Sequence, residues 1–477
     1  MQPDRLAEQL SHYSIPHTIP ALTPRNNSGH NFVVYGDCCS GIPGGPHEAN
    51  FAAVNAVIAR LDPPPEFLCF LGDEIKGLLV DDAALRQQWR YWLDHEMAWL
   101  DCTATPLYQC PANHTAYDPA SEAVFRQVLS HLPQNGPPDQ RGLSYFVRRG
   151  DLLLVFVNTM WSGLGGEGRV ETAWLAQTLR DHADAYHKLV LGHHPVHPIN
   201  GFSGEYQRTI EEENGRVFWQ ILVEHNVLAY LCSHIMAFDV QVHQGVLQIL
   251  TGGAGTLPLT PETEYLHCVQ CTLDADGLRY QVLDTGGQAR EWLRWPLALP
   301  SESASRELTH GIQEAPFVPP KVDAAGDPHL VIWRFEGITA ASEEGTQQTL
   351  LSMWDDGPQL APFWIGLMGA EQRVTVQLSP EPGRSPRYWL GPTLAPGQPF
   401  AFQIALHSGM GPGGLLWRWR DDAPWSTLRN ANAWGAERLT WQPTWGVGCD
   451  QRGVEGRLFQ GEALRVSVIH TAKSCKL

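Results

Sequence analysis

No stretch of apolar residues in this chain reaches the length of about 20 residues that a membrane-spanning helix needs. Residues 1–30 mix proline, histidine, asparagine and charged side chains, and they lack the short apolar block of a secretory signal. We therefore expect no membrane association, and the sequence favours the cytoplasm as the compartment.

Cysteine is also scarce, with 10 residues in a chain of 477, so a dense disulfide framework is excluded and reduced thiols are expected. Cys268 and Cys271 have the CxxC spacing, but they lie in an extended stretch in which positions three apart face opposite sides of a strand. Because no second pair accompanies them, they give weak support for a zinc site.

Positive charge is in deficit, since 33 lysines and arginines stand against 51 acidic residues and the formal net charge is −18. Binding to a polyanion depends on basic side chains that displace counterions, so this balance argues against long nucleic acid as a partner. The fractions of hydrophobic residues, 43%, and charged residues, 18%, are typical of a globular protein. The length exceeds what one core usually supports, which favours two domains.

The first region, from Asn31 to about Thr285, alternates short apolar runs with segments of helical period, which is typical of stacked α/β units. The expected strands are 32–35, 67–71, 152–158, 188–191, 228–232 and 246–250. Residues 81–101 predict an amphipathic helix. Its apolar stripe consists of Leu85, Trp89, Leu93, Met97 and Leu100.

The second region begins after residues 296–325, which are rich in proline, serine and glutamate without periodicity and are interpreted as a linker. In the domain expected at residues 326–477, strand-like runs alternate with turns and helical pattern is scarce. The runs are 329–335, 349–354, 363–368, 373–378, 400–407, 415–420 and 464–470. This pattern predicts an all-β antiparallel sandwich.

Polar side chains of the first region gather in five segments, each at the end of an expected strand. The segments are Val33-Val-Tyr-Gly-Asp-Cys-Cys39, Phe70-Leu-Gly-Asp-Glu74, Pro111-Ala-Asn-His-Thr115, Leu189-Val-Leu-Gly-His-His-Pro195 and Leu231-Cys-Ser-His234. Each alone has an ordinary structural explanation, because Asp caps helices, Asn forms turns and most lone histidines are structural. Their order along the chain is more specific.

This order, Asp, then Gly-Asp, then Asn-His, then His and His, resembles the calcineurin-like metallophosphoesterase superfamily, which includes the purple acid phosphatases. The resemblance covers roughly residues 30–285 and extends to an expected hairpin, 143–159, and a helix, 172–179. It implies a four-layer α/β/β/α fold, in which two sheets pack face to face with helices outside. We assign this domain to residues 31–295, after an N-terminal extension at 1–30.

The resemblance implies a dinuclear metal centre. Its second metal position corresponds here to Asp73, Asn113, His193 and His234, a mixed set of N and O donors that suits Mn²⁺, Fe²⁺ or Zn²⁺. Its first position would take Asp37 and Asp73 together with two histidines, and in this chain those two places hold Cys39 and Met236.

These departures bear on the first metal. Cys39 can still bind as a thiolate, whereas the thioether of Met236 is a poor ligand for a hard divalent ion, so one or two metals are expected. Lys76 occupies the place where the purple acid phosphatases have a metal-binding tyrosine. It either supplies positive charge near Asp37 and Asp73 or is an ordinary surface lysine.

The implied reaction is attack on phosphorus by metal-bound water, with a small phosphorylated molecule as substrate. By resemblance, His114 lies near the leaving-group oxygen, where it acts as general acid or stabilises charge, unless it is only a loop histidine. His194 and His197 are candidate phosphate contacts, or they pack around the neighbouring prolines.

In the second region, the succession Trp417, Trp419, Trp425 and Trp434 resembles the concanavalin A-like lectin and laminin-G-like jelly rolls. The resemblance implies a jelly-roll sandwich that binds a carbohydrate or protein ligand.

Two rival motifs are weaker. Gly163 to Gly168 fits GxGxxG, but four residues separate it from the preceding strand, which is too long for the tight first turn of a dinucleotide site. His95-Glu96 begins a zincin-like pattern whose second ligand position holds Trp99. Three hypotheses follow: an active phosphoesterase for mono- or diesters, a degenerate relative that binds a phosphorylated ligand or partner without turnover, and a scaffold acting through its β-sandwich.

Overall fold

A computed structural model describes residues 15–25, 29–160, 168–202, 208–258, 264–299, 303–316, 330–354, 363–378, 386–407, 414–431, 443–450 and 457–471. The chain separates into two compact units, of which the first runs to Pro296 apart from two short segments, and the second starts at Leu297.

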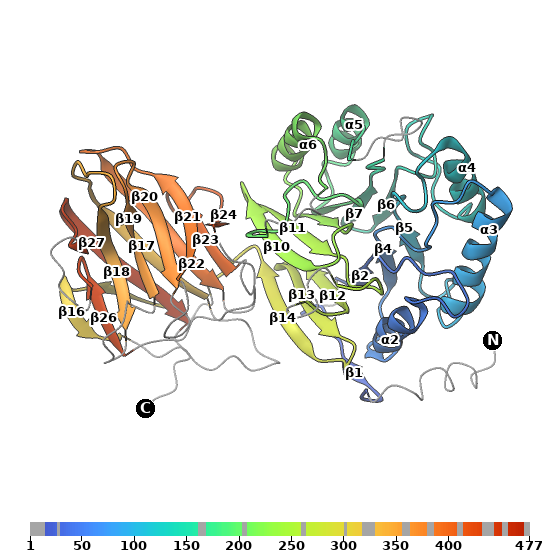
Figure 1. The fold of residues 1–477 in the computed structure, drawn as a ribbon, viewed down its shortest axis with the longest axis horizontal. Helices are drawn as coiled ribbons and strands as arrows, with labels where there is room; N and C mark the ends of the chain where they lie inside the picture. The colour runs from blue at the N-terminus through green and yellow to red at the C-terminus, as the bar shows by residue number, and fades with distance from the viewer. Residues whose placement is uncertain are drawn as a thin grey trace. The chain divides into compact units, whose positions relative to one another are not determined.

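The first unit is a mixed α/β structure built on two sheets of six strands (Figure 1). One sheet has the order β14 (Ala289–Trp295), β13 (Gly277–Asp284), β12 (His267–Asp274), β2 (His30–Tyr35), β4 (Phe67–Phe70), β5 (Leu107–Gln109). The other has the order β10 (Phe238–His243), β11 (Val246–Thr251), β9 (Ala229–Cys232), β8 (His187–Leu191), β7 (Leu152–Phe156), β6 (Tyr145–Arg149).

Each sheet contains a run of adjacent parallel strands, and their burial explains why most of them are continuous apolar runs in the sequence. Strands β2, β4 and β5 run parallel in one sheet, and β7, β8, β9 and β11 in the other. Parallel strands end at the same edge of a sheet, where ligand sites of α/β proteins form. The polar residues that follow these strands are therefore brought to one edge of each sheet.

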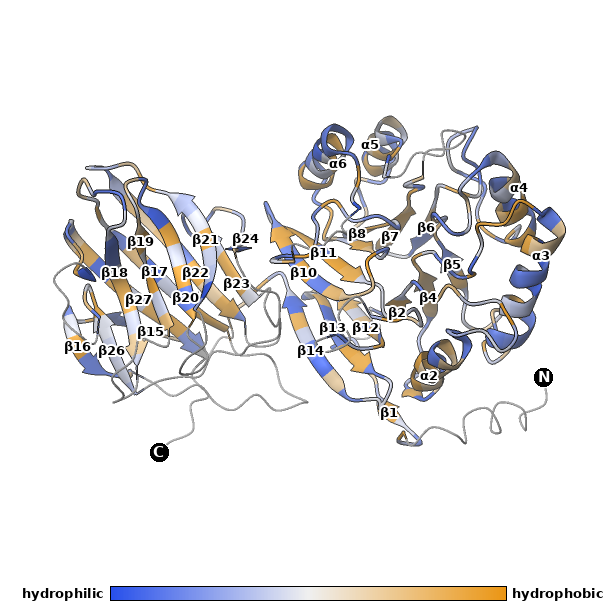
Figure 2. Ribbon diagram, viewed as in Figure 1, coloured by the Kyte–Doolittle hydropathy of each residue, from blue (hydrophilic) through white to orange (hydrophobic). Residues whose placement is uncertain are grey.

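Helices follow the strands β2, β4, β5, β7 and β8. They are α2 (Glu48–Ile58), α3 (Asp82–Tyr91), α4 (Pro119–Val128), α5 (Thr172–Asp181) and α6 (Glu212–Glu224). Figure 2 shows that α5 and α6 each carry hydrophobic and hydrophilic residues on different faces, as expected for helices that cover a sheet. None of the helices in the described ranges is both long enough and apolar enough to cross a lipid bilayer.

The expected helix at residues 81–101 is shorter than its apolar stripe suggested. After α3 the chain forms one π-helical turn, η1 (Trp92–Glu96), and then leaves the helix. A π turn holds more residues than an α turn and shifts the buried face, so Trp92 is fully buried while Leu93 is only half-buried. The carboxylate of Glu96 at the end of this turn accepts hydrogen bonds from Ser40 Oγ and from the backbone N–H of Gly41.

The remaining expectations for this unit agree with the described elements. The six expected strands correspond to β2, β4, β7, β8, β9 and β11, the expected hairpin is the antiparallel pair β6–β7, and the expected helix is α5. Cys268 and Cys271 are buried free thiols on β12. Residues 163–167 of the GxGxxG motif lie outside the described residues.

The second unit contains two antiparallel sheets. One has the order β15 (Ser303–Leu308), β27 (Glu462–Thr471), β17 (Leu330–Ile338), β22 (Pro399–His407), β23 (Leu415–Arg418), β24 (Ser426–Thr427). The other has the order β16 (Gly311–Glu314), β26 (Thr444–Val447), β18 (Gln347–Trp354), β19 (Phe363–Met368), β20 (Arg373–Leu378), β21 (Arg387–Thr393), β25 (Arg429–Asn430). The seven expected strands match β17, β18, β19, β20, β22, β23 and β27, except that residue 329 is outside the described ranges. Both sheets contribute to one apolar core that includes Trp333 and Trp445.

Within the expected linker, residues 303–308 and 311–314 instead form strands β15 and β16. Each pairs at the edge of a sheet, β15 with β27 and β16 with β26. Their side chains are mostly exposed or half-buried, so the sequence shows no apolar alternation. Edge strands that carry polar side chains are hard to separate from loops by pattern alone.

The described part of the N-terminal extension is attached to the first unit. Its strand β1 (Ile19–Pro20) pairs with β3 (Leu61–Asp62). Gln270, on β12, accepts a hydrogen bond from the backbone N–H of Leu22 and donates one to its carbonyl oxygen.

Candidate metal centre

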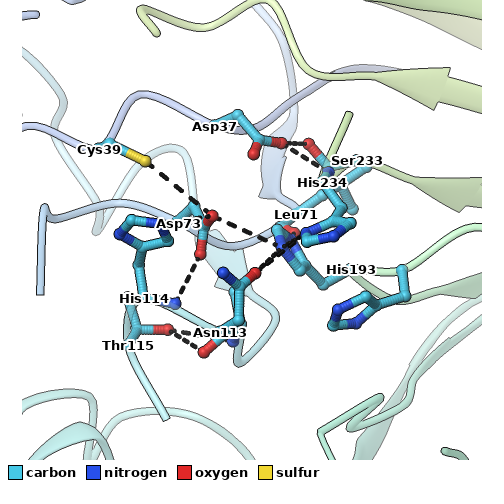
Figure 3. A network of polar contacts seen from close by, with 12 residues as sticks. Asp37, Cys39, Leu71, Asp73, Asn113, His114, Thr115, His193, Ser233 and His234 are labelled. Atoms are coloured by element: carbon cyan, nitrogen blue, oxygen red, sulfur yellow. Dashed lines mark hydrogen bonds and ion pairs between the residues drawn. The ribbon is translucent and has the colours of Figure 1, made fainter. Parts of the chain in front are cut away.

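The chemically active side chains follow strands of both sheets. Asp37, Asp73 and Asn113 come after β2, β4 and β5 of one sheet, while His193 and His234 come after β8 and β9 of the other. Figure 3 shows these side chains directed toward one another. The structure therefore assembles the site at the carboxyl ends of parallel strands, as the topology requires.

The backbone at the site is strained in several places. Asp37, Cys39, Asp73 and His234 all have positive φ, which is uncommon outside glycine. Such residues persist where surrounding structure holds them, and they concentrate at functional sites. Gly72 has a φ of +98°, and a Cβ on it would lie 2.9 Å from His193 Nδ1. Glycine at position 72 therefore allows the His193 ring to approach Asp73.

Three neutral donor atoms form a tight triangle. His193 Nε2 lies 2.9 Å from Asn113 Oδ1 and 3.0 Å from His234 Nδ1, and His234 Nδ1 lies 3.0 Å from Asn113 Oδ1. The carboxylate oxygen Oδ2 of Asp73 is 3.6 Å from His193 Nε2. The four residues expected at the second metal position are thus brought together.

The His193 ring directs a lone pair into this triangle. His193 Nδ1 lies 2.8 Å from the carbonyl oxygen of Leu71, which only accepts, so Nδ1 carries the proton and Nε2 of the neutral ring has a lone pair. Burial lowers the pKa of His193 well below its usual value, which keeps the ring neutral. The contact of 2.9 Å between His193 Nε2 and Asn113 Oδ1 therefore joins two acceptors with no hydrogen between them.

A divalent ion resolves this arrangement. Nitrogen and oxygen atoms bound to one ion at about 2.1 Å lie about 3.0 to 3.4 Å apart, close to the separations in the triangle. The Leu71 carbonyl fixes the His193 tautomer in the way that hydrogen-bonded partners orient metal-binding histidines. The residues present thus fit a transition metal.

Asp73 lies between His193 of the second metal position and Cys39 of the first. Its Oδ1 accepts a hydrogen bond of 3.0 Å from the backbone N–H of His114. Its Oδ2 faces His193 Nε2 at 3.6 Å, Cys39 Sγ at 3.9 Å and His114 Nε2 at 4.0 Å. This is the position that a bridging carboxylate needs.

Asp37 lies on the other side of Asp73, and the Asp37, Asp73 and His193 side chains can offer ligand atoms within 4.8 Å of one another. One oxygen of Asp37 accepts hydrogen bonds from Ser233 Oγ and, at 2.7 Å, from the backbone N–H of His234. Burial and then the neighbouring Asp73 carboxylate raise the pKa of Asp37 to about 8. Two buried carboxyl groups this close repel each other when both are ionised, so the pair needs either a proton on one of them or a cation nearby.

Cys39 reaches the centre. It is half-buried, and together with Asp73 and His114 it forms a second group that can offer ligand atoms within 4.8 Å. Burial and then the charge of Asp73 raise the pKa of the Cys39 thiol well above its usual value. Met236 is half-buried two residues after His234, and its presence in the same pocket stays a prediction. Lys76 is exposed, which agrees with the surface interpretation.

His114 is oriented by the backbone. Its Nδ1 lies 2.6 Å from the carbonyl oxygen of Lys76, so Nδ1–H donates and Nε2 is left to face Asp73 Oδ2. Gly77 permits this approach, because a Cβ there would lie 1.5 Å from the carbonyl oxygen of His114. The His114 side chain is 24% exposed, so a solute can contact it.

His194 and His197, the two histidines expected to contact phosphate, lie in different surroundings. His194 is buried beside His193 and His234, with ring centroids 5.0 Å and 4.2 Å away. His197 is half-buried, and its ring packs edge-on against Trp219 of α6 at 4.6 Å. Substrate binding by either residue stays a prediction.

Several contributors to the site escaped the sequence interpretation. Ser233 holds Asp37, the Leu71 carbonyl holds His193, and Thr159 Oγ1 lies 2.8 Å from His194 Nδ1. Ser233 and Leu71 lie within the expected motifs, but neither was assigned a role, and a backbone carbonyl carries no residue-type signal. Arg208 was also missed, although its charge contributes to lowering the pKa of His234 and of His194.

No family model matches this chain, and no curated protein does. Among solved structures, it is similar to purple acid phosphatase PPD1 from yellow lupin (Lupinus luteus) seeds, with 14% identity and a TM-score of 0.42, over 57% of this chain and 54% of that one. It is similar to a dimetal phosphatase from Danio rerio, with 16% identity and a TM-score of 0.40, over 56% and 99%. It is also similar to the CBM40 of Ruminococcus gnavus IT-sialidase bound to α2,6 sialyllactose, with 13% identity and a TM-score of 0.24, over 36% and 93%. At these values none of the matches assigns a function to this chain.

Proposed function

We propose that residues 31–295 form a metal-dependent phosphoesterase domain that hydrolyses a small phosphate mono- or diester. The observation that carries this proposal is the triangle of His193 Nε2, Asn113 Oδ1 and His234 Nδ1 beside the Asp73 carboxylate. A divalent cation would satisfy these buried atoms together, and mixed N and O donors suit Mn²⁺, Fe²⁺ or Zn²⁺. The ordered motifs support a four-layer metallophosphoesterase fold for this domain.

The residues divide into two roles. Asp73, Asn113, His193 and His234 would hold one divalent ion, with Asp37 and Cys39 completing a second, weaker position. A bound ion supplies charge to the phosphoryl oxygens and lowers the pKa of a coordinated water. His114, as an imidazolium with protons on both ring nitrogens, would supply the Nε2 proton to the leaving-group oxygen while its Nδ1–H stays on the Lys76 carbonyl.

Two basic side chains that solvent can reach fit an anionic substrate despite the net charge of −18. Lys76 is exposed, His114 is partly exposed, and the charges of both act on the half-buried His47 nearby. Local positive charge attracts an anion over a short range even when the whole protein repels it. This favours a small phosphorylated molecule.

A second candidate function is binding of a phosphorylated ligand or partner without turnover. Cys39 and Met236 favour it, because they replace two imidazoles with a thiol and a thioether and weaken the first metal position. The third hypothesis concerns residues 326–477, for which we propose a concanavalin A-like jelly roll that binds a carbohydrate or protein. Its exposed Trp419 packs edge-on against Trp417 at 5.3 Å and is available for such contact.

Metal analysis combined with a panel of phosphate esters tests the proposal. We expect at least one equivalent of transition metal in the purified chain and turnover of one or more aryl phosphate mono- or diesters that stops after chelation. A chain that holds metal and binds inorganic phosphate but turns over no ester would establish the binding protein instead. A chain that binds no divalent metal but still binds inorganic phosphate would also favour the binding protein, and a chain that binds neither would contradict both.

A further inference from the structure

His194 is a third imidazole beside the expected metal donors. It follows His193 directly after β8, and all of its side chain is buried. His193, His194 and His234 can each offer one ring nitrogen so that the three nitrogens lie within 4.8 Å of one another. The resemblance in the sequence places only His193 and His234 among the ligands, so this third ring has no assigned part in metal binding.

Hydrogen-bonding contacts with Tyr230 and Thr159 hold the backbone and the ring of His194. The Tyr230 hydroxyl donates a hydrogen bond of 2.6 Å to the His194 carbonyl oxygen, and Thr159 Oγ1 accepts one of 3.3 Å from the His194 backbone N–H. Thr159 Oγ1 also lies 2.8 Å from His194 Nδ1. These contacts fix both the backbone and one ring nitrogen, so Nε2 is the atom left to act.

Nε2 of His194 is buried and has no hydrogen-bond partner among the described residues. A buried polar atom without a partner is costly, and a bound water or ion is one explanation for it in native proteins. If Nδ1–H donates to Thr159, Nε2 presents a lone pair that suits a cation. If Thr159 instead donates to Nδ1, Nε2 carries a proton that suits a phosphate oxygen.

Access favours the cation. Nε2 is closed to solvent, so a phosphate group, which is larger than water, cannot reach it without rearrangement of the site. A single ion occupies far less space, and His193, His194 and His234 can each offer one ring nitrogen within 4.8 Å of the other two. The contact from Nδ1 to Thr159 then has the form of the hydrogen bond that usually orients a metal-binding histidine.

We propose that His194 is a metal ligand that joins His193 and His234 in a site of three imidazoles for a borderline divalent ion such as Zn²⁺. The third imidazole offsets the histidines that Cys39 and Met236 replace. This inference rests on the proposed metal centre, but it does not depend on turnover.

Cobalt binding by the full chain tests the proposal, after chelation and removal of the chelator. We expect His193→Ala to abolish Co²⁺ binding and His194→Ala to weaken it on the order of 10²-fold, with a changed visible spectrum, because each removes a ligand. Thr159→Val should weaken it about 10-fold through the lost orienting hydrogen bond. His187→Ala is the matched control and should bind Co²⁺ normally, because His187 lies at the opposite end of β8 and contacts Asp274.

The outcomes separate the two proposals. Unchanged Co²⁺ affinity in His194→Ala, with loss in His193→Ala, would overturn the three-imidazole site and leave the proposed function intact. The same result with weakened binding of inorganic phosphate would make His194 a phosphate contact instead. No Co²⁺ binding by the unmodified chain would overturn the metal centre itself.

A measurement on the unmodified chain avoids any effect of the substitutions on folding. With ¹⁵N-labelled histidine, addition of one equivalent of Zn²⁺ should shift the ring-nitrogen signals of three histidines to values typical of zinc ligation. Shifts of only two would contradict the proposal.

Discussion

The two halves of the candidate centre differ in whether burial favours the protonation state in which their side chains bind a metal. In the half formed by Asn113, His193 and His234, burial lowers the pKa of both imidazoles, to about 3 for His234, so they are neutral ligands. In the half formed by Asp37 and Cys39, burial raises both pKa values, to about 8 for Asp37. Desolvation always opposes the charged form, so the same environment prepares imidazoles as ligands and keeps acids protonated.

A strong and a weak set of metal ligands can thus lie side by side at one edge of a fold. The imidazole half binds a cation without releasing protons, whereas the Asp37–Cys39 half must first lose them, which weakens binding at neutral pH. Asp73 belongs to both halves because its Oδ2 faces His193 and Cys39. We therefore expect ordered occupancy, with the imidazole half filled first.

The largest effect should come from His193→Ala. Removing this ligand should empty the imidazole half and lower ester hydrolysis on the order of 10³-fold or more, because the bound ion supplies the main charge stabilisation. Metal content and rate are measured together, and excess metal should restore part of both. Undiminished metal content in a folded variant would show that the imidazole half is not the metal site.

A smaller effect is expected from His114→Ala, which leaves both metal positions intact. The rate should fall on the order of 10²-fold through loss of the general acid, without rescue by added metal. The rate of hydrolysis should fall further for esters with poor leaving groups than for esters with good ones, because a good leaving group such as an acidic phenol needs little protonation. Equal losses across such a series would limit His114 to a positioning or electrostatic role.

The next effect should come from placing histidines at positions 39 and 236, where the resemblance expects them. Cys39→His combined with Met236→His should raise affinity at the weak position about 10-fold or more, because imidazole replaces a protonated thiol and a thioether. Metal content should then rise from about one toward two equivalents per chain at limiting metal concentrations. The matched control is Cys38→His, which alters the neighbouring thiol, whose Sγ contacts the Glu74 carbonyl away from Asp73. No gain over that control would show that residues 39 and 236 do not line the centre.

The smallest effect should come from Ser233→Ala. It removes the hydroxyl donor to Asp37 Oδ2 and leaves the backbone donor from His234 in place. Loss of such an orienting contact should weaken metal at the Asp37 half about 10-fold and leave the imidazole half unchanged. Stepwise metal titration separates the two; equal weakening of both halves would contradict their independence.

The strands that place the site were predictable because they are buried on both faces and therefore appear as continuous apolar runs. Their carboxyl ends then locate Asp37, Asp73, His193 and His234, whereas the short strand β5 before Asn113 was not among the expected strands. Strands β15 and β16 were missed because their exposed side chains leave no apolar pattern. The end of the helix at Glu96 was missed because a contact with Ser40, distant in sequence, fixes it.

Within the site, residue types were predictable but their connections were not. The order of motifs indicated ligands, yet the proton on His193 Nδ1 depends on the carbonyl of Leu71, which every residue type carries. The burial of His194 and its contact with Thr159 likewise depend on β7 and β8 lying side by side. Neighbouring histidines in a sequence do not reveal which ring nitrogen is left without a partner.

Anomalous scattering from crystals of the full chain grown with Mn²⁺ or Zn²⁺ tests the central claim most directly. We expect the strongest peak at about 2.0 to 2.2 Å from His193 Nε2, Asn113 Oδ1 and a carboxylate oxygen of Asp73. Any peak near Asp37 should be weaker and appear only at higher metal concentration. Data that show these side chains in place with no anomalous peak among them, at saturating metal, would contradict the account.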